Sequence, residues 1–565
     1  MDHKLQYTEC PWVGSYPQGV PNNFEIEPKT ICDAFYEAAE KWSERTALIF
    51  YGEKITFKKL REKIDRFANA LVQIGLKKGD RLALLLLNSP EFVIAFYGGI
   101  RAGAIITPIS PVYVSSEIRH QLEDSGAEII VCLDMLRGNL EKTGVALKKV
   151  ILTNICDSLP FYKKFAKRKI LEGVQRRMPA ESNRIVSKEN YLLFKDLLKQ
   201  FPAVQPDVKV EPDDVATLHY TGGTTGQPKG AMSTHANIIL GEKAYHTFYS
   251  PKEGRDVYIA YMPFYHAGGQ FLAVLSGLIH GTTLVVITTP DVDDILQAIN
   301  RYNVTFFFGA PAIYETLKNH EKTGTVDWKK FDYVISSADS LHEATAEQWK
   351  ARTGIPLNDI WGMTEVSAIS LGNPPGKIKT GSIGVPMPNT KVAILDPDDD
   401  VFVSQGEIGE LSINGRQVSP GYWNNPEATK ECEAVIDGER WWRSGDLARM
   451  DEDGYFYIYD RKRDLIKYKG LRVYAREVEE IIKAHPKVKE VGVVGVKDIK
   501  VGEIVKALVV LESDARGNLA ETEIIEYCKD KLTRYKIPKI VEFVSEIPKT
   551  DIGKVSRREL REIED

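Results

Sequence analysis

A glycine- and threonine-rich segment, YTGGTTGQPKG at residues 220–230, contains the residue types that most clearly suggest chemistry. Glycines let backbone N–H groups surround an anion, while threonine hydroxyls and a lysine add donors and positive charge. A Walker A loop requires glycine directly before its lysine, but Pro228 precedes Lys229, and no GxGxxG pattern is present. A flexible linker would explain the glycines only. The segment therefore predicts a phosphate-binding loop outside the P-loop and dinucleotide-binding classes.

Four other short segments contain side chains suited to nucleotide or acyl chemistry. WGMTE at residues 361–365 combines a flat aromatic ring with a carboxylate, which suit base stacking and a hard cation. Asp446 in RSGDL offers a carboxylate to vicinal hydroxyls. His266 lies in MPFYHAGG, and Lys554 lies in IPKTDIGKVSRREL. Taken singly, the tryptophan and the histidine could be core residues and the lysine a surface residue.

Together and in this order, the segments resemble the motifs of the AMP-forming adenylation superfamily, which includes acyl-CoA synthetases, luciferases and peptide-synthetase adenylation domains. The resemblance implies an AMP-forming acid-thiol ligase that uses ATP, Mg²⁺ and coenzyme A. A carboxylic acid would attack the α-phosphate of ATP, diphosphate would leave, and CoA would take the acyl group from the adenylate. A nucleotide-binding protein without catalysis is the less favoured alternative, because Lys554 and Glu365 are both present.

The resemblance also implies roles for single residues. Lys554 is expected at the carboxylate and α-phosphate, Thr364 at the α-phosphate, and His266 at the acyl site. Thr221 and Glu365 are expected to hold the metal. The nucleotide and co-substrate residues implied are Thr221, Gly222, Gly223, Thr224, Thr225, Gly226, Lys229, Ala338, Asp339, Ser340, Asp359, Trp361, Gly362, Asp446, Arg461 and Gly470, with Arg463 as the hinge. For Asp359 two interpretations remain, an acceptor for the adenine amino group or a helix-start residue.

The acid is predicted to be a medium- or long-chain fatty acid. Acetyl-specific relatives carry a tryptophan at the position of Gly362, so glycine leaves room for a longer chain. The segment YPQGVPNNFEIEP at residues 16–28 also resembles the opening of fatty acyl-CoA ligases. A short hydroxy acid, such as hydroxybutyrate or hydroxypropionate, and an aryl acid remain as alternatives. An alternative of another class is a stand-alone adenylation module that charges a carrier protein, which the absence of aspartate from 263 to 274 disfavours.

The elements that must position these residues follow an α/β rhythm. Apolar runs predict strands at 81–87, 104–107 and 128–132, with helices beginning at Pro90 and spanning 116–123. The same alternation returns from 256 to 308, and a strand at 215–218 and a helix after His235 flank the glycine-rich loop. The pattern predicts a large N-terminal domain of layered α/β sheets with largely parallel strands.

Beyond Asp446 the sequence changes to a charged run, DRKRDLIKYKGLRV, and then to a compact segment. Its periodicity predicts helices at 476–484 and 520–532 and strands at 490–496 and 504–511. We therefore expect a small, mobile α+β domain at residues 461–565, a large domain at 1–460, and a hinge near 461–464.

Bulk composition excludes several classes. The net charge of −5 gives no basic field for nucleic acid, and no zinc-like spacing occurs. Six scattered cysteines, no secretory signal and no transmembrane segment favour a cytoplasmic protein. The basic stretch at 159–177 favours a solvated surface helix, with peripheral membrane contact as the alternative. The sequence leaves a homo-oligomer open.

Overall fold

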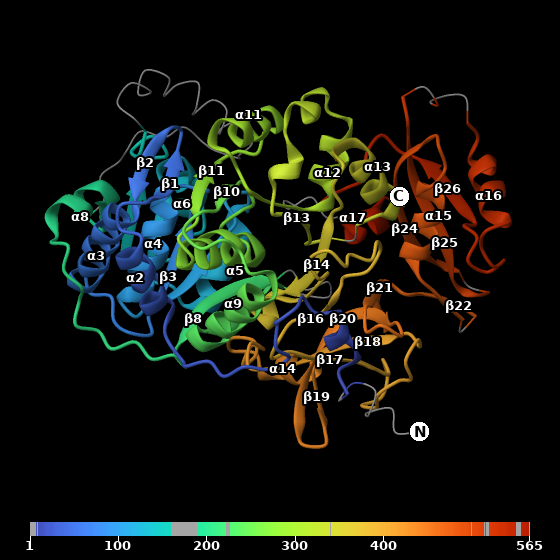
Figure 1. Ribbon diagram of the computed structural model, residues 1–565, viewed down its shortest axis with the longest axis horizontal. Coiled ribbons are helices and arrows are strands. Elements are labelled where there is room, and N and C mark those ends of the chain that lie inside the picture. Colours follow the sequence, from blue (N-terminus) through green and yellow to red (C-terminus); the bar gives the residue numbers. More distant parts are fainter. Residues whose placement is uncertain are drawn as a thin grey trace.

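The computed structural model describes residues 7, 9–159, 189–221, 227–339, 341–469, 471–498, 500–513, 515, 519–549 and 555–563. Two large sheets with their helices, a third sheet and a small C-terminal domain make up the molecule (Figure 1). The predicted fold class, layered α/β sheets followed by a small domain, is therefore confirmed.

The first large sheet consists of β1 (Thr46–Phe50), β2 (Glu53–Thr56), β10 (Val257–Ala260), β11 (Thr283–Val286), β12 (Phe306–Gly309), β13 (Tyr333–Ser336), β14 (Asn358–Met363), β15 (Ala368–Gly372) and β16 (Val385–Pro386). Their order is β16-β15-β14-β13-β12-β10-β11-β1-β2. The strands from β14 to β1 run parallel, and β2 and β15 pair antiparallel at either end. Every residue of the inner strands β11 and β12 is buried, as expected when helices cover both faces of the sheet.

The second large sheet consists of β3 (Arg81–Leu85), β4 (Ile105–Pro108), β5 (Ile129–Leu133), β6 (Lys149–Thr153), β7 (Tyr191–Leu193), β8 (Val215–Thr221) and β9 (Lys229–Thr234). Their order is β7-β6-β5-β3-β4-β8-β9, and all neighbours are parallel except β8 and β9. The strands predicted at 81–87, 104–107, 128–132 and 215–218 are confirmed. The sequence analysis did not predict β9. Because β9 pairs antiparallel with β8, the glycine-rich loop joins two antiparallel strands.

The helices of the large domain are α2 (Ile31–Lys41), α3 (Phe57–Gln73), α4 (Pro90–Arg101), α5 (Ser115–Ser125), α6 (Arg137–Lys142), α8 (Phe194–Gln200), α9 (His235–Tyr249), α10 (Ala267–Gly269), α11 (Val292–Tyr302), α12 (Pro311–Asn319), α13 (Glu343–Thr353) and α14 (Pro426–Glu431). Shorter 3₁₀ segments are η1 (Pro11–Ser15), η2 (Asp134–Leu136), η5 (Glu321–Thr325), η6 (Trp328–Lys330), η7 (Thr364–Val366) and η8 (Lys462–Asp464), while η4 (Gln270–Gly277) is a π-helix. The predicted helix starts at Pro90 and His235 are confirmed. Ser89 caps the first and Thr234 caps the second.

Helix α4 lies in the interior between the other helices and the second sheet. All its residues from Pro90 to Ile100 are buried, which explains why its sequence is apolar on every side. A Cβ on Gly98 would come 2.8 Å from Phe67 of α3, and one on Gly99 would come 2.7 Å from Leu82 of β3. The glycine pair therefore lets this helix approach its neighbours on both sides.

The third sheet is antiparallel and consists of β17 (Lys391–Leu395), β18 (Gly409–Asn414), β19 (Glu433–Ile436), β20 (Glu439–Met450) and β21 (Phe456–Arg461). Strand β20 pairs with β18, β19 and β21 and so is the centre of the sheet. The register places Asp446 of β20 opposite Arg461 of β21.

The small domain consists of β22 (Ile466–Tyr468), β23 (Leu471–Val473), β24 (Val488–Asp498), β25 (Gly502–Leu511), β26 (Ile540–Phe543), α15 (Ala475–Lys483), α16 (Glu521–Lys529) and α17 (Arg557–Glu562). It lies against α12, α13 and β21 (Figure 1). Alternate residues of β24 and β25 face two separate apolar clusters, with Val478 of α15 in one and Leu560 of α17 in the other. The four predicted elements of this domain are confirmed within a few residues at each end.

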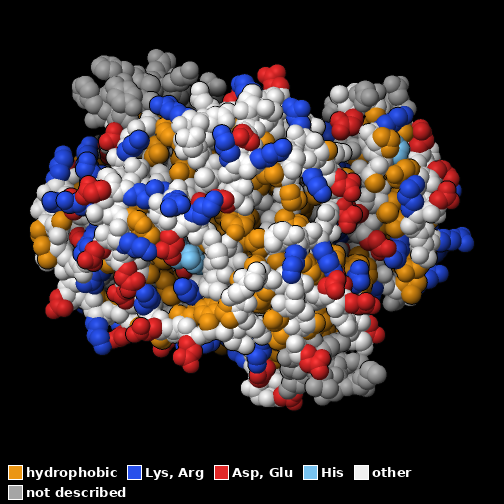
Figure 2. All heavy atoms as spheres, in the orientation of Figure 1, with side chains coloured by type: hydrophobic (Ala, Val, Ile, Leu, Met, Phe, Trp, Pro, Cys, Tyr) orange, Lys and Arg blue, Asp and Glu red, His pale blue; other side chains and the backbone are white. Residues whose placement is uncertain are grey.

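The surface of the molecule carries charged side chains of both signs (Figure 2). Acidic and basic side chains are interspersed over the face drawn in Figure 2. Among the described residues, no helix is both long enough and apolar enough to cross a membrane. The basic helix predicted at 159–177 falls outside the described residues beyond Leu159.

Candidate active site

The predicted site residues gather at the carboxyl ends of neighbouring parallel strands. His266 follows β10, Asp339 follows β13, and Glu365 follows β14. In open α/β sheets this edge is where ligands bind, because loops from several strands meet there. Residues that lie far apart in the sequence are thus placed along one edge of the nine-stranded sheet.

The phosphate-loop candidate is the turn of the β8–β9 hairpin. Thr221 at the end of β8 pairs with Lys229 at the start of β9, while residues 222–226 lie outside the described residues. The Tyr220 hydroxyl donates to Asp124 Oδ2 at 2.6 Å and fixes the end of β8 to α5. The hairpin therefore places Thr221 and Lys229, both predicted to bind phosphate, side by side at its end next to the loop.

Glu365 lies at the centre of a buried group of oxygen atoms. The hydroxyl of Tyr422 donates to Glu365 Oε1 at 2.6 Å, and Thr221 Oγ1 donates to the same atom at 3.5 Å. Glu365 is only 6% exposed. Carboxylate and hydroxyl oxygens are the ligands that Mg²⁺ accepts, so the donors fit the metal expected at Thr221 and Glu365.

The segment from Ser419 to Trp423 is a part of the site that the sequence analysis missed. Its backbone pairs with β9 through Met232 N donating to Gly421 O at 3.0 Å and Trp423 N donating to Gly230 O at 2.8 Å. The ring centroid of Tyr422 lies 5.2 Å from Lys229 Nζ. Only the proline and glycine around this tyrosine marked the segment in the sequence, and they indicate a turn rather than a site.

Trp361, Asp446 and Arg461 form a connected group on β14, β20 and β21. The indole Nε1 of Trp361 donates to Asp446 Oδ2 at 2.8 Å, and Arg461 Nε lies 2.7 Å from Asp446 Oδ1. The carboxylate is 4% exposed, so both of its oxygens are oriented by neighbouring side chains. The structure thus brings together the residues predicted for adenine and for ribose.

Asp359 lies within β14, so its interpretation as a helix-start residue is wrong. Its Oδ1 is buried and has no hydrogen-bond partner in the described part of the chain. Burial raises its pKa to about 7, although Arg476 of α15 counteracts part of this rise. A buried oxygen without a donor fits the remaining interpretation, an acceptor for the amino group of a base.

The segment 338–340, which is predicted to contact the nucleotide, begins with an unusual backbone conformation. Ala338 has a φ of 77°, in the left-handed region that non-glycine residues rarely adopt. Asp339 follows it, and Ser340 lies outside the described residues. Backbone of this kind concentrates at ligand-binding positions, where surrounding structure holds it in place.

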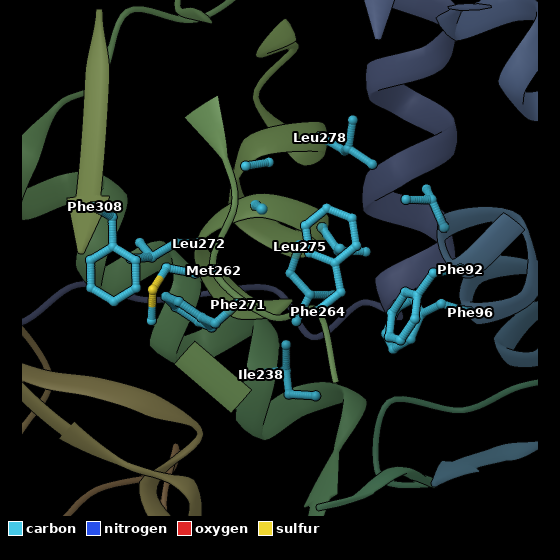
Figure 3. Close-up of a cluster of buried hydrophobic side chains, with 14 of the residues drawn as sticks. Phe92, Phe96, Ile238, Met262, Phe264, Phe271, Leu272, Leu275, Leu278 and Phe308 are labelled. Carbon is cyan, nitrogen blue, oxygen red and sulfur yellow. The ribbon is translucent and has the colours of Figure 1, made fainter. Parts of the chain in front are cut away.

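His266 and Gly362 are the residues predicted for the acyl side of the site. His266 Nδ1 accepts from Gly268 N at 3.3 Å, and this turn leads into the π-helix η4, which the sequence did not predict. Helix α10 packs against β14, where Gly362 lies. Behind the turn is the apolar cluster drawn in Figure 3, whose labelled members are Phe92, Phe96, Ile238, Met262, Phe264, Phe271, Leu272, Leu275, Leu278 and Phe308.

Three predicted positions belong to the small domain or to its connection. Lys554 and Gly470 lie outside the described residues, and Arg463 lies in η8 directly after β21. The structure reveals one further residue beside this connection. Arg557, three residues beyond Lys554, pairs with Asp460 Oδ1 at 2.6 Å and Glu479 Oε2 at 2.8 Å.

Comparison with known proteins identifies the family of the chain. Residues 35–423 match the AMP-binding enzyme family, and residues 477–554 match the AMP-binding enzyme C-terminal domain. A long-chain-fatty-acid–CoA ligase from Yersinia pestis is 38% identical over 563 residues, covering 98% of each chain. The 4-coumarate-CoA ligase 1 of Narcissus pseudonarcissus is 31% identical, covering 93% of this chain and 92% of that protein.

A solved structure of the same kind is similar over nearly the whole chain. ATP-bound MatB from Rhodopseudomonas palustris superposes with a TM-score of 0.81 at 27% identity, covering 94% of this chain and 98% of MatB. The family models together cover most of the chain, and the relatives match it over nearly its whole length. The chain belongs to the AMP-binding enzyme family.

Proposed function

We propose that the protein is an AMP-forming acyl-CoA synthetase that joins a long-chain or medium-chain fatty acid to coenzyme A. The proposal is carried by two contacts near the carboxyl end of β14 in the nine-stranded sheet. Glu365 meets Thr221 of β8, and Trp361 meets Asp446 of β20. The first group suits a metal-bound triphosphate, and the second suits a nucleoside. Full-length relatives named long-chain-fatty-acid–CoA ligases support the acid class.

ATP binds across the two groups. Asp446, oriented by the indole N–H of Trp361 and the guanidinium of Arg461, accepts the ribose hydroxyls. The buried Oδ1 of Asp359 accepts from the adenine amino group. Thr221 and Lys229 hold the phosphates together with residues 222–226. Mg²⁺ supplies positive charge on the phosphate oxygens, and Glu365 with Thr221 would hold it.

In the first half-reaction, a carboxylate oxygen of the acid forms a bond to the α-phosphorus and the bond to diphosphate breaks. Thr364, next to the metal-holding Glu365, contacts the α-phosphate, while Lys554 from the small domain neutralises charge on the carboxylate and phosphate. In the second, the CoA sulfur bonds to the acyl carbon and AMP leaves. The thiol proton is released to solvent, so atoms and charge balance.

The two half-reactions call for two positions of the small domain. We place the domains at 1–460 and 461–565, with the hinge near 461–464 and Arg463 as its hinge residue. The arrangement described here is held by polar contacts, including His342 Nδ1 to Glu480 Oε1 at 2.8 Å and Lys483 Nζ to Glu315 Oε1 at 3.1 Å. A polar interface of this type can be broken and remade, as rotation requires. Gly470 would border the passage for pantetheine.

The apolar surroundings of the acyl side favour a fatty acid. His266 follows Met262 and Phe264 in the chain, and both belong to the cluster in Figure 3. This cluster contains aromatic and aliphatic side chains from α4, α9, β12 and η4. Gly362 lies on β14, which contacts the helix α10 directly after His266, and adds no side chain there. An aryl acid is the second candidate, because the relative from Narcissus is a 4-coumarate-CoA ligase.

The deciding experiment is a panel of acids assayed with ATP, Mg²⁺ and CoA, reading AMP and acyl-CoA formation. Palmitate and octanoate are expected to give the highest kcat/KM, above acetate, hydroxybutyrate, 4-coumarate and benzoate. A preference for an aromatic or hydroxy acid would overturn the substrate class but keep the ligase. CoA-independent AMP release, with transfer to a carrier protein, would overturn the acceptor. Cytoplasmic location, a homo-oligomer and membrane contact through 159–177 stay predictions.

A further inference from the structure

A partly buried cluster of histidine and glutamate side chains lies outside the proposed active site. His246 is in the last turn of α9, Glu253 is in the loop before β10, and His280 follows η4. Glu242, one turn before His246 on α9, completes the group. None of these residues has a role in the proposed reaction, and their spacing along the chain did not indicate a metal site.

Three donor atoms of the cluster have separations that suit one metal ion. Glu253 Oε1 lies 3.4 Å from His280 Nδ1 and 3.5 Å from His246 Nε2, and all three donors lie within 4.8 Å of one another. Ligands about 2.0–2.1 Å from a tetrahedral zinc ion are separated by roughly 3.4 Å. The centroids of the two imidazole rings lie 3.6 Å apart and the rings are nearly parallel, so one ring must turn before both lone pairs can meet at one ion.

Glu242 fixes the orientation of His280. This carboxylate is 3% exposed and accepts from His280 Nε2 at 2.7 Å and from Ser276 Oγ at 3.0 Å. With Nε2 donating to the carboxylate, Nδ1 is the ring atom that faces Glu253. A histidine held by a buried carboxylate through one nitrogen, with the other nitrogen toward neighbouring donors, is the usual support of metal-binding histidines.

His246 presents a buried ring nitrogen to the cluster. Its Nε2 makes no hydrogen bond among the described residues. This atom lies 3.5 Å from Glu253 Oε1, and all three donors lie within 4.8 Å of one another. The nitrogen is therefore placed where it can bind an ion that the other two donors also reach.

We propose that His246, His280 and Glu253 bind a divalent transition-metal ion of the zinc class, with water as a fourth ligand and Glu242 orienting His280. Two imidazoles and one carboxylate favour zinc over the magnesium that accompanies ATP, because nitrogen donors suit transition metals. Lys41 opposes binding, since its Nζ lies 2.8 Å from the second carboxylate oxygen of Glu253. This lysine is exposed and can move aside.

Metal at this position would tie α9 to the segment that follows η4. Helix η4 supplies Phe271, Leu272 and Leu275 to the apolar cluster behind the acyl side (Figure 3). Binding to the folded chain alone stabilises that chain by mass action. The melting temperature is therefore expected to rise with zinc concentration.

The test uses the full chain without an affinity tag, freed of metal by chelation, and titrated with Zn²⁺ by calorimetry and with Co²⁺ by visible absorbance. One ion per chain and an intense tetrahedral Co²⁺ spectrum are expected. Glu253→Gln and His246→Gln are expected to weaken binding by about tenfold or more, and Glu242→Gln by about 10–100-fold. Lys41→Met is expected to strengthen it.

His320→Gln is the matched control, since His320 also lies beside a carboxylate, with Nε2 3.5 Å from Asp293 Oδ1, but outside the cluster. The Zn²⁺ affinity of the His320→Gln variant should equal that of the unaltered chain. Absence of zinc binding, or equal binding by Glu253→Gln, His246→Gln and the unaltered chain, would overturn the proposal. Glu253 has a 40% exposed side chain, so its variant is expected to fold, and circular dichroism checks this.

Discussion

The indole N–H of Trp361 donates to the carboxylate of Asp446 at 2.8 Å, joining a strand of the main sheet to a strand of the third sheet. The family resemblance implied separate tasks for these two residues, stacking on adenine and binding ribose. In the structure the first also orients the second. The proposed nucleoside site therefore draws its residues from two sheets.

Trp361→Phe is expected to raise the KM for ATP by about tenfold, with a smaller effect on kcat. Phenylalanine keeps an aromatic face for the base but loses the hydrogen bond to a charged carboxylate, which contributes roughly 1.5 kcal/mol or more. Steady-state kinetics with varied ATP measures the change. Trp328→Phe is the control, because it loses a buried hydrogen bond to Thr323 away from the site. Equal KM values for the two variants would contradict the role of Trp361.

Tyr422→Phe is expected to raise the Mg²⁺ concentration needed for half-maximal activity by about threefold to tenfold. The variant removes the 2.6 Å hydrogen bond that orients Glu365, and one hydrogen bond contributes about 1 kcal/mol. Activity measured against Mg²⁺ at saturating ATP reports this change. Tyr455→Phe, which loses a hydrogen bond to the backbone of Lys377, should behave like the unaltered enzyme. A lower kcat with an unchanged Mg²⁺ requirement would disprove the expectation.

Asp359→Asn is expected to flatten the pH dependence of stability. Burial raises the pKa of Asp359 to about 7, so the native state holds a proton that the unfolded state releases near pH 4. The native state therefore binds more protons between about pH 4 and pH 7, and stability falls as pH rises through this window. The loss has an upper bound of roughly 4 kcal/mol, because each pKa unit is worth about 1.4 kcal/mol.

Denaturant unfolding of the ligand-free chain at pH 5 and pH 8 measures this effect. The gain of the variant over the unaltered chain should be larger at pH 8 than at pH 5. Asp339→Asn is the control for a general change in local charge, because Asp339 follows the neighbouring strand β13. The same difference at both pH values would show that Asp359 does not titrate in this window.

Arg557→Gln is expected to destabilise the small domain by about 3–5 kcal/mol, because Asp460 and Glu479 would remain buried without their cation. Since Arg557 lies three residues after Lys554, adenylation should also fall. Urea unfolding and AMP formation test both effects. Arg561→Gln is the control, since the Arg561 side chain is 42% exposed and, among the described residues, forms an ion pair with Asp464 alone. It should cost less than about 1 kcal/mol.

Lys554→Ala provides the kinetic reference for this prediction. It is expected to abolish adenylation but to preserve thioester formation from supplied acyl-AMP. Arg557→Gln should reduce adenylation more than thioester formation if it positions this lysine. Equal losses in both half-reactions would assign Arg557 to stability alone.

Gly362→Trp is expected to shift the substrate preference toward shorter acids. An indole at this strand position would occupy space next to the turn that contains His266 and so exclude long chains. The ratio of kcat/KM for palmitate to that for acetate should fall by about 100-fold, comparable to about 3 kcal/mol of lost binding. Gly362→Ala, a much smaller addition, should change the ratio far less. An unchanged ratio for the tryptophan variant would place the acyl chain elsewhere.

Local patterns predicted several elements of the large domain, but not β14, β20 and β21, which hold Trp361, Asp446 and Arg461. The apolar runs at β3 and β5 and the start of α4 at Pro90 depend on neighbouring residues, so periodicity and helix-start signals predicted them. The strand β9 was missed because Pro228 and the glycines before it read as a single loop. The π-helix η4 was missed since its hydrogen bonding differs from that of an α-helix without a clear change in sequence.

The sequence by itself determined the family and the kinds of chemistry, because short motifs such as YTGGTTGQPKG and WGMTE contain their own donors, carboxylates and turns. Only the tertiary structure decided which distant residues meet. Tyr422 joins Glu365 across 57 positions, Trp361 joins Asp446 across 85, and His246 meets His280 on separate elements. Such contacts depend on sheet order and helix packing, and these follow from burial of the whole chain rather than from local spacing.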